Sequence, residues 1–76
     1  MSVELRIPKL GVAMTDGTLV EWLVGDGDAV AAGTPVYRLE TDKVENEVEA
    51  PGPGTLRIIA VEGEVYAVGT VVATLE

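Results

Sequence analysis

The stretch VYRLETDKVENEVEA, residues 36–50, lies at the middle of the 76-residue chain and decides how the rest is organised. Residues 44–50 alternate between Val, Asn or Ala and glutamate, which is the period-2 pattern of a half-buried β-strand. Residues 36–40 predict a second strand on the near side. Thr41-Asp42-Lys43 therefore predicts the tip of a hairpin, since the short Asp side chain accepts hydrogen bonds from nearby backbone in tight turns. Such a hairpin would hold Lys43 in solvent on a two-stranded stalk.

The composition excludes most kinds of active site. The chain has no cysteine and no histidine, so it lacks thiolate ligands, disulfides and the commonest general base. We therefore expect no catalytic residue and no metal site. The formal charge of −8 would repel nucleic acids and anionic membranes, and no apolar run is long enough to span a bilayer. Only Lys9 and Lys43 are lysines, against thirteen acidic residues, which makes a lysine at the hairpin tip unusual.

Short strand-like segments fill the rest of the chain. Further strands are expected at residues 3–8, 17–24, 54–61 and 71–75, with short apolar runs at 29–32 and 65–68. Glycine and proline breaks separate these segments and leave no window for a helical stripe, so the sequence predicts one all-β domain, residues 1–76. Imperfect alternation in the 17–24 segment predicts a bulge. The hydrophobic content is 47% and the aromatic content 4%, so the core must be aliphatic, with Trp22 inside it or at its rim.

Three further segments allow both a structural and a functional interpretation. The apolar residues of loop 9–16 suit either a flap over the core, which we favour, or a surface that meets a partner. The acidic turn at 25–28 is too short for a calcium-binding loop and lacks its spaced ligands. Glu45, Glu47 and Glu49 predict a solvated sheet face that discourages edge-to-edge pairing.

The second half of the chain repeats the first. Gly17-Thr18-Leu19 matches Gly54-Thr55-Leu56, an offset of 37 residues. With one residue dropped at a turn, the further matches are Gly27 with Gly63, Gly33-Thr34 with Gly69-Thr70, Val36 with Val72, and Leu39-Glu40 with Leu75-Glu76. Glycines at such turns suit positive backbone angles. The repeat predicts two similar half-sheets related by a pseudo-two-fold axis, with the last residues at the end opposite Lys43.

Several motifs along the chain are specific to one family. They are Pro8-Lys9-Leu10-Gly11, Gly17-Thr18-Leu19, Trp22-Leu23, Gly27-Asp28, Glu40-Thr41-Asp42-Lys43, Glu47-Val48-Glu49-Ala50-Pro51, Glu62-Gly63 and Val68-Gly69. With these residues the whole chain resembles a lipoyl domain from the acyltransferase component of a 2-oxo acid dehydrogenase complex. The resemblance implies a flattened β-barrel, a barrel-sandwich hybrid, made of two four-stranded antiparallel sheets.

The resemblance also implies a site. Lys43 matches the lysine that carries lipoic acid in amide linkage, as N6-lipoyllysine. Asp42 and Val44 match its flanks, and related biotinyl domains place Met at both positions, which favours lipoate here. Asp42 is equally compatible with two roles: forming the turn, and being recognised by an enzyme. The loop Gly11-Val12-Ala13-Met14 matches the surface loop that helps to decide which enzyme accepts the domain.

The function implied by the resemblance is that of a non-catalytic swinging-arm acyl carrier. Lipoate ligase or lipoyl transferase would modify Lys43. A thiamine-dependent 2-oxo acid decarboxylase, an acyltransferase core and a flavin dihydrolipoamide dehydrogenase would then use the arm in turn, in a 2-oxo acid or acetoin complex. We expect a monomeric domain in the cytoplasm, or in the mitochondrial matrix of a eukaryote. Two alternatives stay open: a biotinyl carrier, and an unmodified binding or scaffolding module with Lys43 as an ordinary turn residue.

Overall fold

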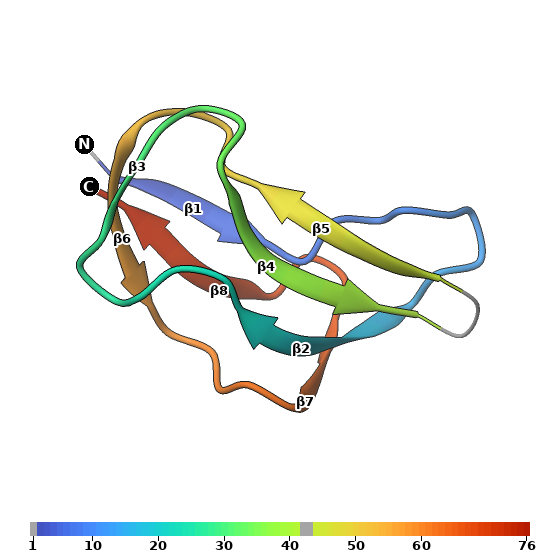
Figure 1. The fold of residues 1–76 in the computed structure, drawn as a ribbon. Helices are drawn as coiled ribbons and strands as arrows, with labels where there is room; N and C mark the ends of the chain where they lie inside the picture. The colour runs from blue at the N-terminus through green and yellow to red at the C-terminus, as the bar shows by residue number, and fades with distance from the viewer. Residues whose placement is uncertain (1, 42–43) are drawn as a thin grey trace.

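In residues 2–41 and 44–76, which the computed structural model describes, the chain forms eight β-strands in two four-stranded antiparallel sheets. The strand order is β1-β8-β6-β3 in one sheet and β5-β4-β2-β7 in the other (Figure 1). None of these residues is helical, which confirms the all-β class and the flattened, two-sheet architecture. The strands are β1 (Val3–Arg6), β2 (Asp16–Trp22), β3 (Ala29–Val30), β4 (Pro35–Glu40), β5 (Glu45–Glu49), β6 (Gly54–Ile58), β7 (Glu64–Ala67) and β8 (Val71–Leu75).

Local sequence explains where several strands end or bend. β1 ends at Arg6, shortly before Pro8, which has no N–H to donate to a ladder. The pairing of β2 with β4 shifts between Leu19 and Glu21, which confirms the bulge predicted from the irregular alternation. The short apolar runs become the short strands β3 and β7. No helix in the described parts of the chain could cross a membrane.

The sequence repeat is also a structural repeat. Exchanging β1 with β5, β2 with β6, β3 with β7 and β4 with β8 turns the strand order of one sheet into that of the other. The connecting turns obey the same exchange. The N–H of Gly27 donates to the carbonyl of Leu56 at 2.6 Å, and the N–H of Gly63 donates to the carbonyl of Leu19 at 2.7 Å. The pseudo-two-fold arrangement is therefore confirmed.

The matched glycines explain why the turns repeat. In the described residues, positive φ angles occur at four glycines and range from 83° to 91°: Gly27, Gly33, Gly63 and Gly69. A side chain at these angles would clash with its own backbone, so glycine is the residue that adopts them without strain. The prediction for these four positions is confirmed.

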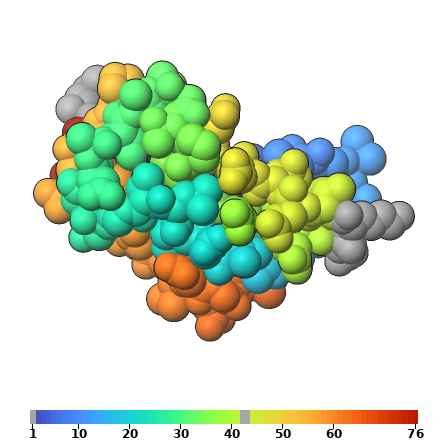
Figure 2. All heavy atoms as spheres, viewed as in Figure 1, coloured from blue at the N-terminus to red at the C-terminus, as the bar shows by residue number. Residues whose placement is uncertain are grey.

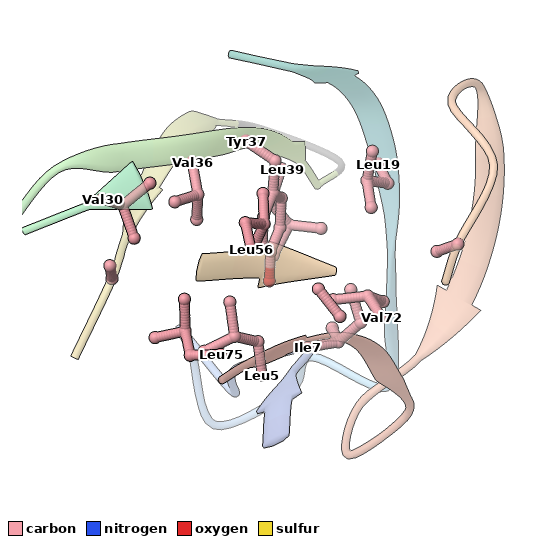
Figure 3. Packing of buried hydrophobic residues seen from close by; sticks show 13 residues of the cluster. Leu5, Ile7, Leu19, Val30, Val36, Tyr37, Leu39, Leu56, Val72 and Leu75 are labelled. Carbon is pink, nitrogen blue, oxygen red and sulfur yellow. The ribbon is translucent and has the colours of Figure 1, made fainter. Parts of the chain in front are cut away.

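The core lies between the two sheets and is built from repeat partners (Figure 3). Leu19 and Leu56 are both 0% exposed, and so are Val36 and Val72. Full burial of such a side chain stabilises the fold by roughly 1.5–3 kcal/mol. The main departure from symmetry is Tyr37, which is fully buried where the second half has a buried Ala73, and which packs edge-to-face on Trp22 at 5.3 Å between ring centroids.

The two ends of the elongated body, which measures 32 × 20 × 18 Å, carry different parts of the chain. Both termini lie at one end, while β4 finishes and β5 begins at the other (Figure 1). At the first end, Glu76 and Thr55 exchange two backbone hydrogen bonds of 2.9 Å. Asp42 and Lys43 lie outside the described residues. Their described neighbours Thr41 and Val44 stand at the end opposite Glu76, as the repeat predicted for this hairpin.

Candidate functional site

The hairpin flanks form a regular ladder up to its last described pair. Glu40 pairs with Glu45 in the register of β4 and β5. Beyond this pair, the N–H of Thr41 donates to the carbonyl of Val44 at 2.8 Å, and the Thr41 hydroxyl donates to the same oxygen at 3.3 Å. Only positions 42 and 43 separate these two residues in the chain. A group attached within that interval would therefore start from a base that backbone hydrogen bonds hold in place.

The loop between β1 and β2 is partly closed on itself. The N–H of Met14 donates to the carbonyl of Gly11 at 3.1 Å, and the N–H of Leu10 points at the Met14 sulfur at 3.3 Å. Met14 also packs against the core, whereas Leu10 is 46% exposed and Val12 is 97% exposed. The expectation of a flap over the core is thus wrong for most of this loop. Apart from Met14, residues 9–16 are exposed, so the apolar tip of the loop lies in solvent.

An open hollow of about 810 Å³ joins this loop to the hairpin flanks. Its lining comes from three parts of the chain: the segment from Leu10 to Thr18, the flanks Glu40, Thr41 and Val44, and Val65 of β7. Figure 2 shows the blue loop and the yellow β5 meeting at the same end of the molecule. Gly11, Val12, Ala13, Met14 and Val44, predicted separately as recognition residues, are therefore brought to one surface. Asp42 and Lys43 lie outside the described residues.

Sequence reasoning missed Val65, which completes the hollow. This valine lies in the second half of the chain, and it reaches the site because β7 pairs with β2, with Val65 opposite Thr18. Val65 is 60% exposed, although its neighbour Tyr66 packs against the core. An apolar residue on the outer side of an edge strand was the available indication, but single exposed valines are common on protein surfaces.

The surroundings of the site are acidic. Asp16 and Glu40 contribute to the hollow, and Glu45 and Glu47 stand exposed on β5 beside it. Arg38 on β4 neutralises part of this negative charge. Its guanidinium lies 2.6 Å from Glu21, 3.8 Å from Glu45 and 3.9 Å from Glu47. The row of glutamates on β5 is solvated, as predicted, and gives this end a negative potential that favours basic partners.

The described residues have two further properties relevant to the site: how their potential metal ligands are grouped and which pKa values are shifted. None of them form a group of three or more potential metal ligands. Burial raises the pKa of Tyr37 to about 12, so this phenol stays protonated near neutral pH, and it lies in the core away from the hollow. The aspartates of the 25–28 turn serve the backbone instead: Asp28 accepts from the N–H of Gly25 and Asp26 from that of Ile58, each at 2.8 Å.

Comparison with known proteins places these observations in a family. The biotin/lipoyl family model, described as "Biotin-requiring enzyme", matches residues 3–75. The chain is 46% identical, over 99% of its length, to the dihydrolipoyllysine-residue acetyltransferase component of the pyruvate dehydrogenase complex of Zymomonas mobilis. It is 40% identical, over 96% of its length, to the corresponding component of the acetoin cleaving system of Cupriavidus necator. The chain spans 18% and 20%, respectively, of these two relatives.

A solved structure agrees with the sequence comparison. The lipoyl domain of the 2-oxoglutarate dehydrogenase complex from Azotobacter vinelandii superposes with a TM-score of 0.80 at 29% identity. The superposition covers 97% of this chain and 95% of that domain, so the likeness concerns a whole domain and not a shared fragment.

Proposed function

This chain belongs to the family of biotinyl and lipoyl domains, and we propose that it is a swinging-arm acyl carrier with a lipoyl group on Lys43. Lipoyl domains carry lipoic acid covalently on a lysine, and Lys43 and Lys9 are the two lysines of this sequence. One observation carries the choice of Lys43. The ladder of β4 and β5 continues to Thr41 and Val44, immediately on either side of positions 42–43, and it does so at the end of the body away from Glu76.

The protein supplies attachment, position and an unreactive scaffold. A lysine stem is long and flexible and ends in an amine suited to amide formation. Hydrogen bonds hold Thr41 and Val44 on either side of the attachment interval, so we expect the motion of the arm to arise between them and not in the strands. The chain has no cysteine and therefore cannot divert the carried disulfide by internal thiol exchange. Tethering then raises the local concentration of the reactive group to roughly millimolar at each partner.

When bound, the lipoyl group supplies a disulfide that takes up an acyl group with two reducing equivalents, releases the acyl group to coenzyme A and is reoxidised. We propose as partners a thiamine-dependent decarboxylase, an acyltransferase core and a flavin dihydrolipoamide dehydrogenase, and lipoate ligase or lipoyl transferase for attachment. The acidic residues beside the hollow support this choice by favouring brief encounters with basic surfaces. Gly11 to Met14, together with Val44, would meet the decarboxylase.

The size of the acyl group is not set by this domain. The similar proteins come from a pyruvate dehydrogenase complex and an acetoin cleaving system, and in each case the matched region is about a fifth of the relative. The hollow, which the described residues form, is open and does not enclose an acyl group. The selection of substrate would therefore belong to the partner enzymes.

The proposal is tested by modification followed by mass spectrometry. The chain is expressed with a lipoate ligase and lipoate, and separately with a biotin ligase and biotin, and intact masses are recorded. We expect one lipoyl addition in the wild type and in Lys9→Arg, and none in Lys43→Arg. The two lysine variants remove the same functional group from the same chain, so Lys9→Arg is the matched control.

The remaining outcomes separate the alternatives. A biotin addition without a lipoyl addition would show a biotinyl carrier. No addition by either ligase would leave the unmodified binding module as the function. The flanks are tested with Asp42→Met combined with Val44→Met, which we expect to shift modification toward biotin; an unchanged preference would show that the flanks do not direct the ligase.

A further inference from the structure

The exposed apolar residues of this domain are concentrated at the hollow. In the described residues seven large hydrophobic side chains are exposed, and four of them line it: Leu10, Val12, Val44 and Val65. The other three, Val3, Ile59 and Val61, do not line it. Apolar surface that gathers around one depression usually marks a place where something binds. The β1–β2 loop, the hairpin flank and β7 each contribute to it, so it depends on the folded arrangement and not on one segment.

We infer that the hollow is a resting site for the lipoyl arm of the same chain, which packs its methylene chain and dithiolane ring there between encounters. The inference rests on the proposed attachment at Lys43. Thr41 and Val44 both line the hollow, and they are the described residues on either side of the attachment interval. An arm attached between these two lining residues could therefore enter the hollow without any movement of the strands.

The chemistry of the hollow matches that of the arm. Its volume of about 810 Å³ lies in the range of roughly 300–1,000 Å³ that small-molecule sites occupy, and its open form suits a chain that must leave again. Its lining combines valine, leucine and methionine side chains with Asp16 and Glu40. The lipoyl amide, methylenes and dithiolane are uncharged, so these carboxylates do not repel them. An anionic ligand of the same size would be repelled.

Weak binding is sufficient because the arm is tethered. A tethered group has an effective concentration of roughly millimolar, so an intrinsic dissociation constant that is also about millimolar would give comparable docked and free populations. An arm held much more tightly could not visit three partners. Docking would cover Val12 and Val65 in the resting state and expose them when a partner takes the arm.

The test compares amide ¹H–¹⁵N spectra of lipoylated and acetylated protein, both in a Lys9→Arg background. Acetylation of Lys43 removes the same positive charge as lipoylation but adds no long arm, so the difference between the two spectra reports the arm. We expect shift differences at Gly11, Val12 and Val65 as well as at residues 40–45. Nuclear Overhauser contacts between the methylenes of the arm and the Val12 and Val65 methyl groups are also expected.

A matched pair of variants tests the location. Val12→Ser should lower the lipoyl-dependent shift differences at Val65 by at least about twofold, because it removes apolar lining from an exposed loop without touching the core. Ile59→Ser removes a side chain that is 59% exposed but does not line the hollow, and it should leave those differences unchanged.

Each result bears on a different statement. If the mass shows no lipoyl group, the proposed function fails before the spectra are taken. If the group is attached but the shift differences stay within residues 40–45, the resting site is refuted and the carrier function stands. Differences at Val65 that weaken on dilution would also refute it, since they would show docking of the arm on a second copy.

Discussion

Residues 8–16 connect Ile7 to Gly17 in the first half of the chain, and residues 51–53 connect the equivalent Ala50 to Gly54 in the second. The equivalence is visible in matching hydrogen bonds, since Gly69 donates to Ile7 at 3.0 Å and Gly33 donates to Ala50 at 2.9 Å. The short connection contains two prolines and lies toward the end with the termini. The long one lies beside the hairpin and lines the hollow. Apart from Tyr37, the core is symmetric while the surface is not. Such a difference can arise because loop length costs little stability and loops carry function.

The largest test of this comparison removes one core side chain from each half. Leu19→Ala and Leu56→Ala each delete a side chain that is 0% exposed, so each should lower the free energy of unfolding by about 2–5 kcal/mol. If the halves are equivalent in the core, the two losses should agree within about 1 kcal/mol, well inside that range. Urea denaturation at pH 7, followed by the fluorescence of Trp22, measures both.

A clear inequality between these two variants would break the comparison, because it would locate the stability of the domain in one half. Val12→Ala is the control from the asymmetric connection. Its side chain is 97% exposed, and we expect a change within about 0.5 kcal/mol.

The sequence predicted the symmetric parts of this molecule better than the asymmetric ones. The repeat predicted equivalent turns at Gly27 and Gly63, because a turn that needs a positive φ favours glycine at that position. The structure confirms a positive φ at both residues. The likeness to a lipoyl domain is also confirmed. The position of loop 9–16 was predicted incorrectly, because apolar residues in a loop do not reveal whether a core remains to be covered. Val65 was missed because only strand pairing across the halves brings it to the hollow.

The next test concerns two equivalent glycines that face different neighbours. A Cβ on Gly17 would lie 2.8 Å from the Cδ1 atom of Leu39, a fully buried core residue. A Cβ on Gly54 would lie 3.1 Å from the carbonyl oxygen of Glu76. We expect Gly17→Ala to cost about 1–3 kcal/mol of unfolding free energy by overpacking. Gly54→Ala should cost less, since its contact is longer and asks its neighbour to give by only a few tenths of an ångström.

Gly52→Ala is the matched control for both glycine variants. A Cβ added to Gly52 would meet nothing within 4 Å and the φ of this residue is not positive, so we expect a change within about 0.5 kcal/mol. Thermal unfolding of the three variants at one protein concentration gives the order. A loss for Gly54→Ala that exceeds that for Gly17→Ala would show that the backbone at Glu76 is held more firmly than the hairpin end.

The two tyrosines provide a smaller test, because one occupies the asymmetric core position and the other lies beside a turn. The Tyr37 hydroxyl is buried without a hydrogen-bond partner among the described residues, whereas that of Tyr66 accepts from the N–H of Val61 at 2.9 Å. Tyr37→Phe should therefore raise the free energy of unfolding by about 1 kcal/mol, and Tyr66→Phe should lower it by about the same amount. Chemical denaturation at pH 7 distinguishes the two signs.

The same pair predicts a pH dependence. Burial raises the pKa of Tyr37 to about 12, while an unfolded tyrosine titrates near pH 10. Between these values the unfolded chain has lost a proton that the folded chain keeps, so wild-type stability falls by about 1.4 kcal/mol per pH unit from this group. That stability is complete below pH 10 and lost as pH rises toward 12. The gap between Tyr37→Phe and wild type should widen over this window, and a constant gap would contradict the burial of the phenol.

The smallest expected effect separates the ion pairs of the two sheets. Arg38 faces three carboxylates on the sheet that carries the hairpin, whereas on the other sheet Arg57 pairs, among the described residues, only with Glu76, at 2.8 Å. Both ion pairs are about half exposed, so Arg38→Gln and Arg57→Gln should each lower the free energy of unfolding by only about 0.2–1 kcal/mol.

The stabilities of the two variants should respond differently to salt. Without Arg38 the three glutamates repel one another, and because charges about 10 Å apart are screened at roughly 0.1 M salt, added NaCl should bring Arg38→Gln back toward wild type. Arg57→Gln leaves a single glutamate and no such repulsion, so its smaller gap should close less. Equal salt slopes would mean that the acidic row on β5 is too well solvated to repel itself, so that the negative potential at the hairpin end has no cost to the fold.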